Sequence, residues 1–142
     1  MKIHIITIGE PKLAYARQGW DEYIGRLKHY HSVRLTHIAD KHNDVEHLLA
    51  AAGPAYKVGL AIEGRQLSSP ELAAKIGGWN QAGREVAFLV GGPDGLQPQV
   101  IAACDMQLSF SKLTFPHDLA MVILAETLYR ASTIAAGQPY HR

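Results

Sequence analysis

The feature that most constrains the fold is a run of five apolar residues that leads into a glycine-rich turn. Residues 86–90 (VAFLV) have no polar side chain at any position. A strand with one solvated face would alternate apolar and polar residues, so this run indicates a strand covered on both faces, as in a parallel sheet. Residues 91–95 (GGPDG) follow. There the backbone can turn with positive φ or approach a ligand closely. The run therefore predicts a buried parallel strand with a loop at its carboxyl end.

A second strand end of this kind follows closely. Residues 106–110 alternate apolar and polar side chains and predict a strand, and the loop after them mixes hydroxyls with apolar groups. Pro116, which lacks an N–H group, closes the loop, and a helix is expected from Asp118 to Ala136. Such a junction presents free backbone groups at the carboxyl edge of a sheet. The two successive loops predict two sides of one pocket for a flat, partly apolar ligand.

The rest of the chain alternates between strand and helix patterns. This alternation predicts an α/β fold with a mostly parallel sheet, helices on both faces and right-handed crossovers. Since no linker or repeat divides the chain, we expect one domain over residues 1–142. The other expected strands are residues 2–8, 32–38 and 56–62, and the other expected helices are residues 13–29, residues 45–52, a segment starting at Ser68 or Ser69, and a short one after Pro98.

Composition limits the classes of function. No run approaches the roughly 20 apolar residues of a membrane span. The single Cys104 excludes an internal disulfide and, with no signal peptide recognisable, favours the cytoplasm. The net charge is +1, from 14 basic and 13 acidic residues. This balance argues against indiscriminate binding of nucleic acid, so an RNA substrate would have to be recognised by its shape and a local patch.

Histidines are concentrated in one part of the chain. Five of the eight lie between His29 and His47, which would be consistent with a metal site. No cysteine lies nearby, and no histidine pair has the spacing of a helix-borne zinc motif. We therefore expect a solvated, partly basic face and no metal.

Three further groups each leave two interpretations open. Lys112 could contact a phosphate, or its side chain could be solvated while its backbone meets the ligand. Glu126 and Arg130 could form an exposed ion pair, but Glu126 falls on the apolar stripe of its helix, which favours a pair that organises a site. The terminal Tyr140, His141 and Arg142 could fray, yet a phenol, an imidazole and a guanidinium are groups used in recognition and proton transfer.

Four motifs in order make the chain resemble a known family. They are residues 91–96 (GGPDGL), 108–117 (LSFSKLTFPH), 124–131 (LAETLYRA) and 139–142 (PYHR). This series resembles the ribosomal RNA large-subunit methyltransferase H family of the SPOUT (α/β-knot) class. The resemblance implies a C-terminal trefoil knot, S-adenosylmethionine as methyl donor and a homodimer with shared sites. It also implies methylation of N3 of a pseudouridine in 23S rRNA, on the assembled ribosome.

The resemblance also implies roles for individual residues. His141 would be the candidate base that removes the acceptor proton, while the arginines would stabilise negative charge. The residues expected at the cofactor are Leu60, Gly91, Gly92, Phe110, Ser111, Lys112, Leu113, Thr114 and Phe115. The residues expected at the acceptor are Glu126, Arg130, Tyr140, His141 and Arg142.

The chain departs from the family pattern at two places. Met121 stands where members often have arginine, which is expected to weaken RNA or interface contacts, and members often continue one residue beyond Arg142. Two other functions remain open at this stage. One is a SPOUT methyltransferase that acts on another RNA, and the other is a non-catalytic α/β module that binds nucleotides or ribosomes.

Overall fold

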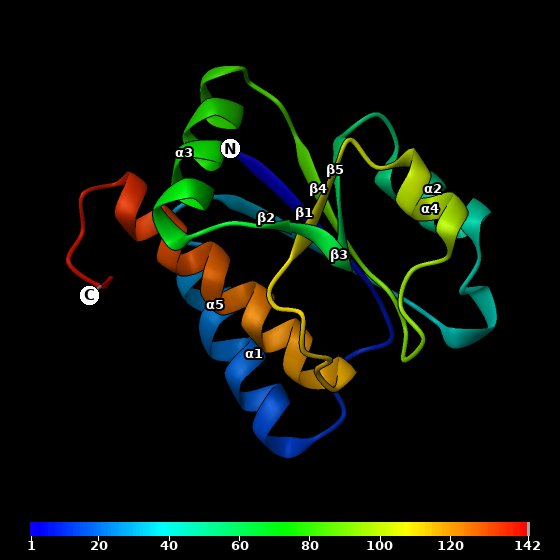
Figure 1. The fold of residues 1–142 in the computed structure, drawn as a ribbon. Helices are drawn as coiled ribbons and strands as arrows, with labels where there is room; N and C mark the ends of the chain where they lie inside the picture. The colour runs from blue at the N-terminus through cyan, green and yellow to red at the C-terminus, as the bar shows by residue number, and fades with distance from the viewer. Residues whose placement is uncertain (142) are drawn as a thin grey trace.

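The computed structural model describes residues 1–141 and contains one five-stranded sheet (Figure 1). The strand order is β2-β1-β4-β3-β5, and every neighbouring pair of strands is parallel. Arg142, one of the residues expected at the acceptor, lies outside the described residues. The strands are β1 (Lys2–Ile8), β2 (Ser32–Ile38), β3 (Tyr56–Gln66), β4 (Val86–Val90) and β5 (Met106–Ser109). The helices are α1 (Ala14–Leu27), α2 (Val45–Ala52), α3 (Ser69–Gln81), α4 (Pro98–Ala103) and α5 (His117–Ala135), with a 3₁₀ turn η1 (Asp40–His42).

Helices cover both faces of the sheet, which confirms the predicted fold class. In Figure 1, α1, α3 and α5 lie on one side of the sheet, and α2 and α4 lie on the other. Strand β4 shows why its sequence has no alternation. Val86, Phe88 and Val90 pack into the core under α1, α3 and α5, whereas Ala87 and Leu89 pack into the core under α2 and α4. Both faces of the central strand are therefore dry.

The start of α5 is tied to the loop between β1 and α1. The Asp118 carboxylate accepts the backbone N–H groups of Lys12 and Leu13, each at 2.7 Å. The neighbouring His117 Nε2 lies 2.8 Å from the carbonyl oxygen of Ile8 and donates to it. These bonds fix the first turn of α5 against the carboxyl end of β1.

Strand β3 is longer than its sequence pattern predicts. The expected strand ended at residue 62, but β3 continues to Gln66. Its pairing with β5 is interrupted, because Leu60 and Arg65 both align with Leu108. The residues between them leave the ladder, which resumes at Arg65. At Gly64 an added Cβ would lie 2.7 Å from the backbone of Gln107. The periodicity of the sequence does not reveal such an excursion, because the excursion is set by contact with another strand.

Two other structural expectations have different outcomes. Among the described residues, no helix is both long and apolar enough to cross a membrane. The trefoil knot, which rests on the family resemblance, stays a prediction.

Candidate active site

A pocket of about 390 Å³ lies where β4 and β5 end, beside the middle of β3. It brings together the two loops that the sequence places at strand ends, with a wall from β3 and a wall from the first turn of α5. Carboxyl ends of parallel strands are the usual ligand sites of α/β sheets. Seven of the nine residues expected at the cofactor line it: Leu60, Gly91, Gly92, Phe110, Ser111, Thr114 and Phe115.

The glycine-rich loop after β4 folds tightly onto itself. The Gly95 N–H donates to the carbonyl oxygen of Gly92 at 2.9 Å, and Gly95 has a φ of +79° that favours glycine. A Cβ on Gly91 would overlap the backbone of Gly95 and would lie 2.5 Å from the nitrogen of Leu96. Gly91 is therefore required by the loop itself. A larger residue at position 91 would distort the loop even in the absence of a ligand.

The loop after β5 is held by its own hydroxyl groups. Ser109 Oγ donates to the carbonyl oxygen of Ser111 at 2.9 Å, and Ser111 Oγ accepts the N–H of Leu113 at 3.0 Å. Lys112 and Leu113 belong to this loop but do not line the pocket, and Leu113 is 71% exposed. Of the two interpretations of Lys112, its exposed side chain fits solvation.

Parts of two walls of the pocket were not expected from the sequence, although Leu60 of β3 was. The excursion in β3 supplies Ile62 and Glu63, and α5 supplies His117 and Ala120. His117 could have been found, since it ends the 108–117 motif directly after the proline that closes the loop. In β3 the resemblance indicated only Leu60, and Ile62 and Glu63 had no comparable signal.

The charged side chains around the pocket are acidic. Glu63 and Asp94 line it, whereas no lysine or arginine of residues 1–141 does so. A pocket that holds a phosphate usually supplies basic side chains, and here only the first turn of α5 could favour an anion. Acidic groups around a mostly apolar cleft instead favour a ligand with a positive centre.

A second group of polar side chains gathers at the other end of α5. Arg130 Nε donates to Glu126 Oε1 at 2.9 Å, so the expected ion pair is present, with 27% of the arginine and 21% of the glutamate side chain exposed. The guanidinium carbon of Arg130 lies 4.7 Å from the centre of the Tyr140 ring. Arg130 Nη1 also donates to His141 Nδ1 at 3.4 Å. The tail is therefore docked on α5 through Arg130.

Tyr140 itself lies in a cluster of aromatic rings. Its ring meets that of Tyr129 edge to face, with 4.7 Å between the ring centres. Burial, together with the nearby Tyr23 and Glu126, raises the pKa of Tyr140 to about 12. The phenol is therefore a neutral hydrogen-bond donor near neutral pH. Met121, one turn into the same helix, is fully buried in the core and does not face solvent.

Within one chain, the pocket and the tail group lie apart. Ala120 lines the pocket and Arg130 holds the tail, and ten residues of helix between them span roughly 15 Å. In Figure 1 the C-terminus lies at the end of α5 remote from the loop that precedes this helix. The residues expected at the cofactor and those expected at the acceptor thus form two separate groups.

Comparison with known proteins agrees with this architecture. A family model described as "Predicted SPOUT methyltransferase" matches residues 1–141. The structure is similar to that of a probable methylase family protein from Haemophilus influenzae Rd KW20. The TM-score is 0.62 at 12% sequence identity, over 99% of this chain and 70% of that chain, a likeness that shows the fold alone. The class that fold and family model define is the SPOUT methyltransferases.

Two relatives narrow the class further. A protein from Deinococcus deserti, named ribosomal RNA large subunit methyltransferase H, is 48% identical over 145 residues and covers both chains completely. One of the same name from Deinococcus radiodurans is 46% identical over 100% of this chain and 99% of its own. The chain belongs to the ribosomal RNA large subunit methyltransferase H family, as the four sequence motifs indicate.

Proposed function

We propose that this protein transfers a methyl group from S-adenosylmethionine to N3 of a pseudouridine in 23S rRNA, on the assembled ribosome. The relatives are named as methyltransferases of large-subunit ribosomal RNA, which supports the choice of RNA. The pseudouridine and its N3 atom come from the family resemblance. Location in the cytoplasm follows from a ribosomal substrate, and one domain per chain would perform the reaction.

The observation that most supports this proposal is the charge of the pocket. S-adenosylmethionine supplies a methyl group on a positively charged sulfonium. Glu63 and Asp94 provide negative charge at the pocket, and its walls are otherwise mostly apolar or backbone. A module that binds nucleotides through their phosphates would need the opposite charge. The residues present therefore fit the methyl donor better than a phosphorylated ligand.

The tail group fits the second requirement of the reaction, which is handling of the acceptor. The imide N3 of a pseudouridine has a proton at neutral pH, so a base must remove it or a donor must stabilise the anion that remains. His141 offers an imidazole, and Arg130 offers a guanidinium held by Glu126. Tyr140 adds a neutral hydroxyl donor. These groups can bind, orient and deprotonate a nucleobase.

A second copy of the chain would bring the two groups together. One chain keeps its pocket and its tail at opposite ends of α5, so neither end contains a full set of reacting groups. In a homodimer with twofold symmetry, the tail of one subunit could meet the pocket of the other twice. This arrangement requires no movement of the tail along α5.

The function can be tested by separating cofactor binding from methyl transfer. Ala120→Phe places a large ring in the pocket and should weaken binding of S-adenosylmethionine more than tenfold, or by more than about 1.4 kcal/mol. Ala135→Phe, on an exposed turn of the same helix, is the matched control and should bind as the parent does. Deletion of residues 140–142 should leave cofactor binding unchanged and reduce methyl transfer to ribosomes by about 10²-fold. Calorimetry and a tritiated-methyl assay measure the two quantities.

Different results would support different functions. A parent protein that does not bind S-adenosylmethionine would point to a non-catalytic module. Methyl transfer to a nucleotide other than a pseudouridine, mapped in ribosomes from a strain that lacks this protein, would keep the class of enzyme but reject the proposed acceptor. Loss of cofactor binding on deletion of the tail would place the tail in the pocket.

A further inference from the structure

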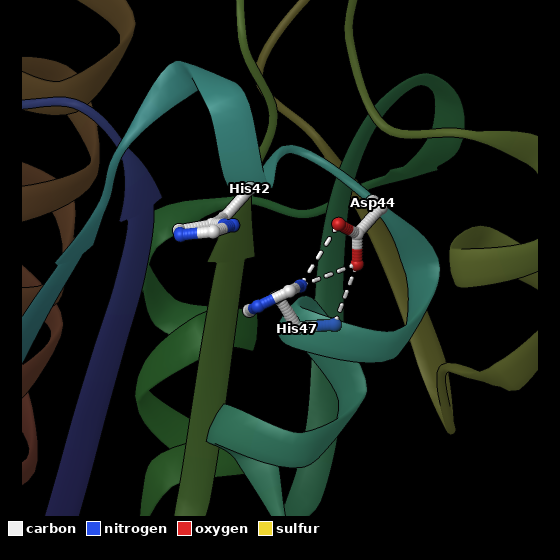
Figure 2. A group of neighbouring side chains, drawn as sticks. All are labelled: His42, Asp44 and His47. Carbon is white, nitrogen blue, oxygen red and sulfur yellow. Dashed lines mark hydrogen bonds and ion pairs between the residues drawn. The ribbon is translucent and has the colours of Figure 1, made fainter.

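Three side chains that can bind metal ions meet beside the N-terminus of α2 (Figure 2). His42 ends η1, Asp44 is the N-cap residue of α2, and His47 lies in the first turn of that helix. One nitrogen or oxygen atom from each side chain lies within 4.8 Å of the other two. The expectation of no metal rested on spacing in the sequence, which does not show that η1 turns His42 towards α2.

Capping of the helix explains only part of this cluster. Asp44 Oδ1 accepts the backbone N–H of His47 at 2.8 Å, as an N-cap side chain does. The carboxylate also lies 2.8 Å from His47 Nδ1, which orients that ring. His42 takes no part in the cap. Its ring nevertheless stacks on His47, with 4.3 Å between the ring centres and 19° between the planes. A ligand bound by all three side chains would explain why they meet at this place.

The charges of the cluster suit a cation. A carboxylate accepts through two oxygens and a neutral imidazole has one nitrogen with a free lone pair, so each of the three side chains has an atom that can bind a cation. The side chains of Asp44 and His47 are each 48% exposed, which leaves space for water.

We propose that His42, Asp44 and His47 bind one zinc ion, with water completing the coordination. Two imidazole nitrogens and one carboxylate oxygen are typical zinc ligands, whereas magnesium and calcium prefer oxygen alone. Bonds of about 2.0–2.2 Å in a tetrahedral arrangement place two ligand atoms roughly 3.3–3.6 Å apart, so a separation at the observed 4.8 Å limit would have to close by more than one ångström. Rotation of exposed side chains can supply that change.

The site would stiffen a segment that contacts the pocket loop. Asn43 lies between His42 and Asp44, and its carbonyl oxygen accepts a hydrogen bond from Gln97 Nε2 at 2.8 Å. The Asn43 side chain also packs against Gly92, where an added Cβ would lie 3.2 Å from Asn43 Nδ2. A zinc ion at the cluster would therefore hold the residue that supports the outer side of that loop.

Calorimetric titration of the untagged protein with zinc chloride tests the site. The expected result is one ion per chain, with at least tenfold weaker binding for His42→Ala and for His47→Ala. The matched control is His29→Ala, which removes an exposed histidine outside the cluster and should bind as the parent does. Absence of saturable binding by the parent, or equal affinity in His42→Ala, would overturn the proposal.

Asp44→Ser separates metal binding from helix capping. Serine keeps an oxygen that can accept the N–H of His47, so the melting temperature without zinc should stay close to that of the parent. Removal of the carboxylate should still weaken zinc binding at least tenfold, the scale on which the loss of a carboxylate near a metal is felt. Parent-like zinc affinity in Asp44→Ser would exclude the carboxylate and overturn the three-residue site.

Discussion

At the scale of single residues, His31 shows how burial sets the protonation of a histidine. Its Nε2 lies 2.9 Å from Ser132 Oγ, and that hydroxyl donates to the carbonyl oxygen of Leu128 at 2.7 Å. The serine oxygen must therefore accept from His31, which leaves Nδ1 to accept from the N-terminal ammonium of Met1 at 3.4 Å. Burial, assisted by that ammonium, lowers the pKa of His31 to about 4.

This neutral histidine predicts a loss of stability in mild acid. The unfolded chain takes up a proton at the ordinary pKa of 6.5, whereas the folded chain does so only near 4. Stability should therefore fall as the pH decreases from about 6.5 towards 4. His31→Gln should make the melting temperature less dependent on pH in this window, although His4, whose pKa burial also lowers, keeps part of the slope.

Melting curves from pH 4 to 7.5 give the measurement, and His29→Gln, at an exposed position, is the control that should retain the parent slope. Identical slopes in the parent and His31→Gln would show that His31 is protonated equally in both states.

At the scale of elements, helix α3 begins with a pair of reciprocal hydrogen bonds in its first turn. Ser68 Oγ accepts the N–H of Glu71 at 3.1 Å, and the Glu71 carboxylate accepts the N–H of Ser68 at 2.8 Å. This capping box forms ahead of a glycine pair at residues 77 and 78, which weakens the helix further along. The capping box therefore offsets the low helix propensity of those glycines.

The contribution of the cap to stability can be measured by comparing a substitution at Ser68 with one at the next residue, Ser69. Ser68→Ala should reduce the free energy of unfolding by about 1 kcal/mol, because an N–H of the first turn loses its acceptor. Ser69→Ala, one residue into the helix, should have little effect. Urea denaturation of both variants gives the comparison, and equal loss in both would mean that general helix propensity, not the cap, determines the result.

The same scale shows which elements the sequence could predict. Residues 2–8 and 86–90 form the expected strands because their apolar content reports burial. Residues 32–38 form the expected strand at the sheet edge, where β-branched residues stand among polar ones and none is buried. Residues 13–29 and 118–136 form helices with ends shifted by one or two residues. The excursion of β3 could not be predicted, since Gly64 is required by the backbone of a partner strand. For the same reason, the sequence did not predict that Glu63 lines the pocket or that His42 lies beside His47.

At the scale of the whole molecule, the separation of pocket and tail along α5 predicts complementation between defective subunits. Ala120→Phe should block the pocket but leave the tail intact, and the chain lacking residues 140–142 should have the reverse defect. In a homodimer with shared sites, each mixed dimer has one complete site. Random exchange of equal amounts makes half of the dimers mixed, so about a quarter of parent activity should return.

The assay is methyl transfer to ribosomes after the two variants have been unfolded together and refolded. Two samples that are refolded separately and then combined at once serve as the control, because they contain few mixed dimers. No recovery in the co-refolded sample would mean that each chain completes its own site.

The acidic lining of the pocket has a consequence for turnover. If S-adenosylmethionine is the methyl donor, as proposed, its sulfonium loses its positive charge on methyl transfer, while the acidic side chains of Glu63 and Asp94 are unchanged. The attraction that helps to hold the reactant is then absent from the product, which should dissociate faster for that reason alone. A pocket of this charge therefore favours release of the product after each reaction. The protein would then bind a new methyl donor before it meets its next ribosome, even where the demethylated by-product accumulates.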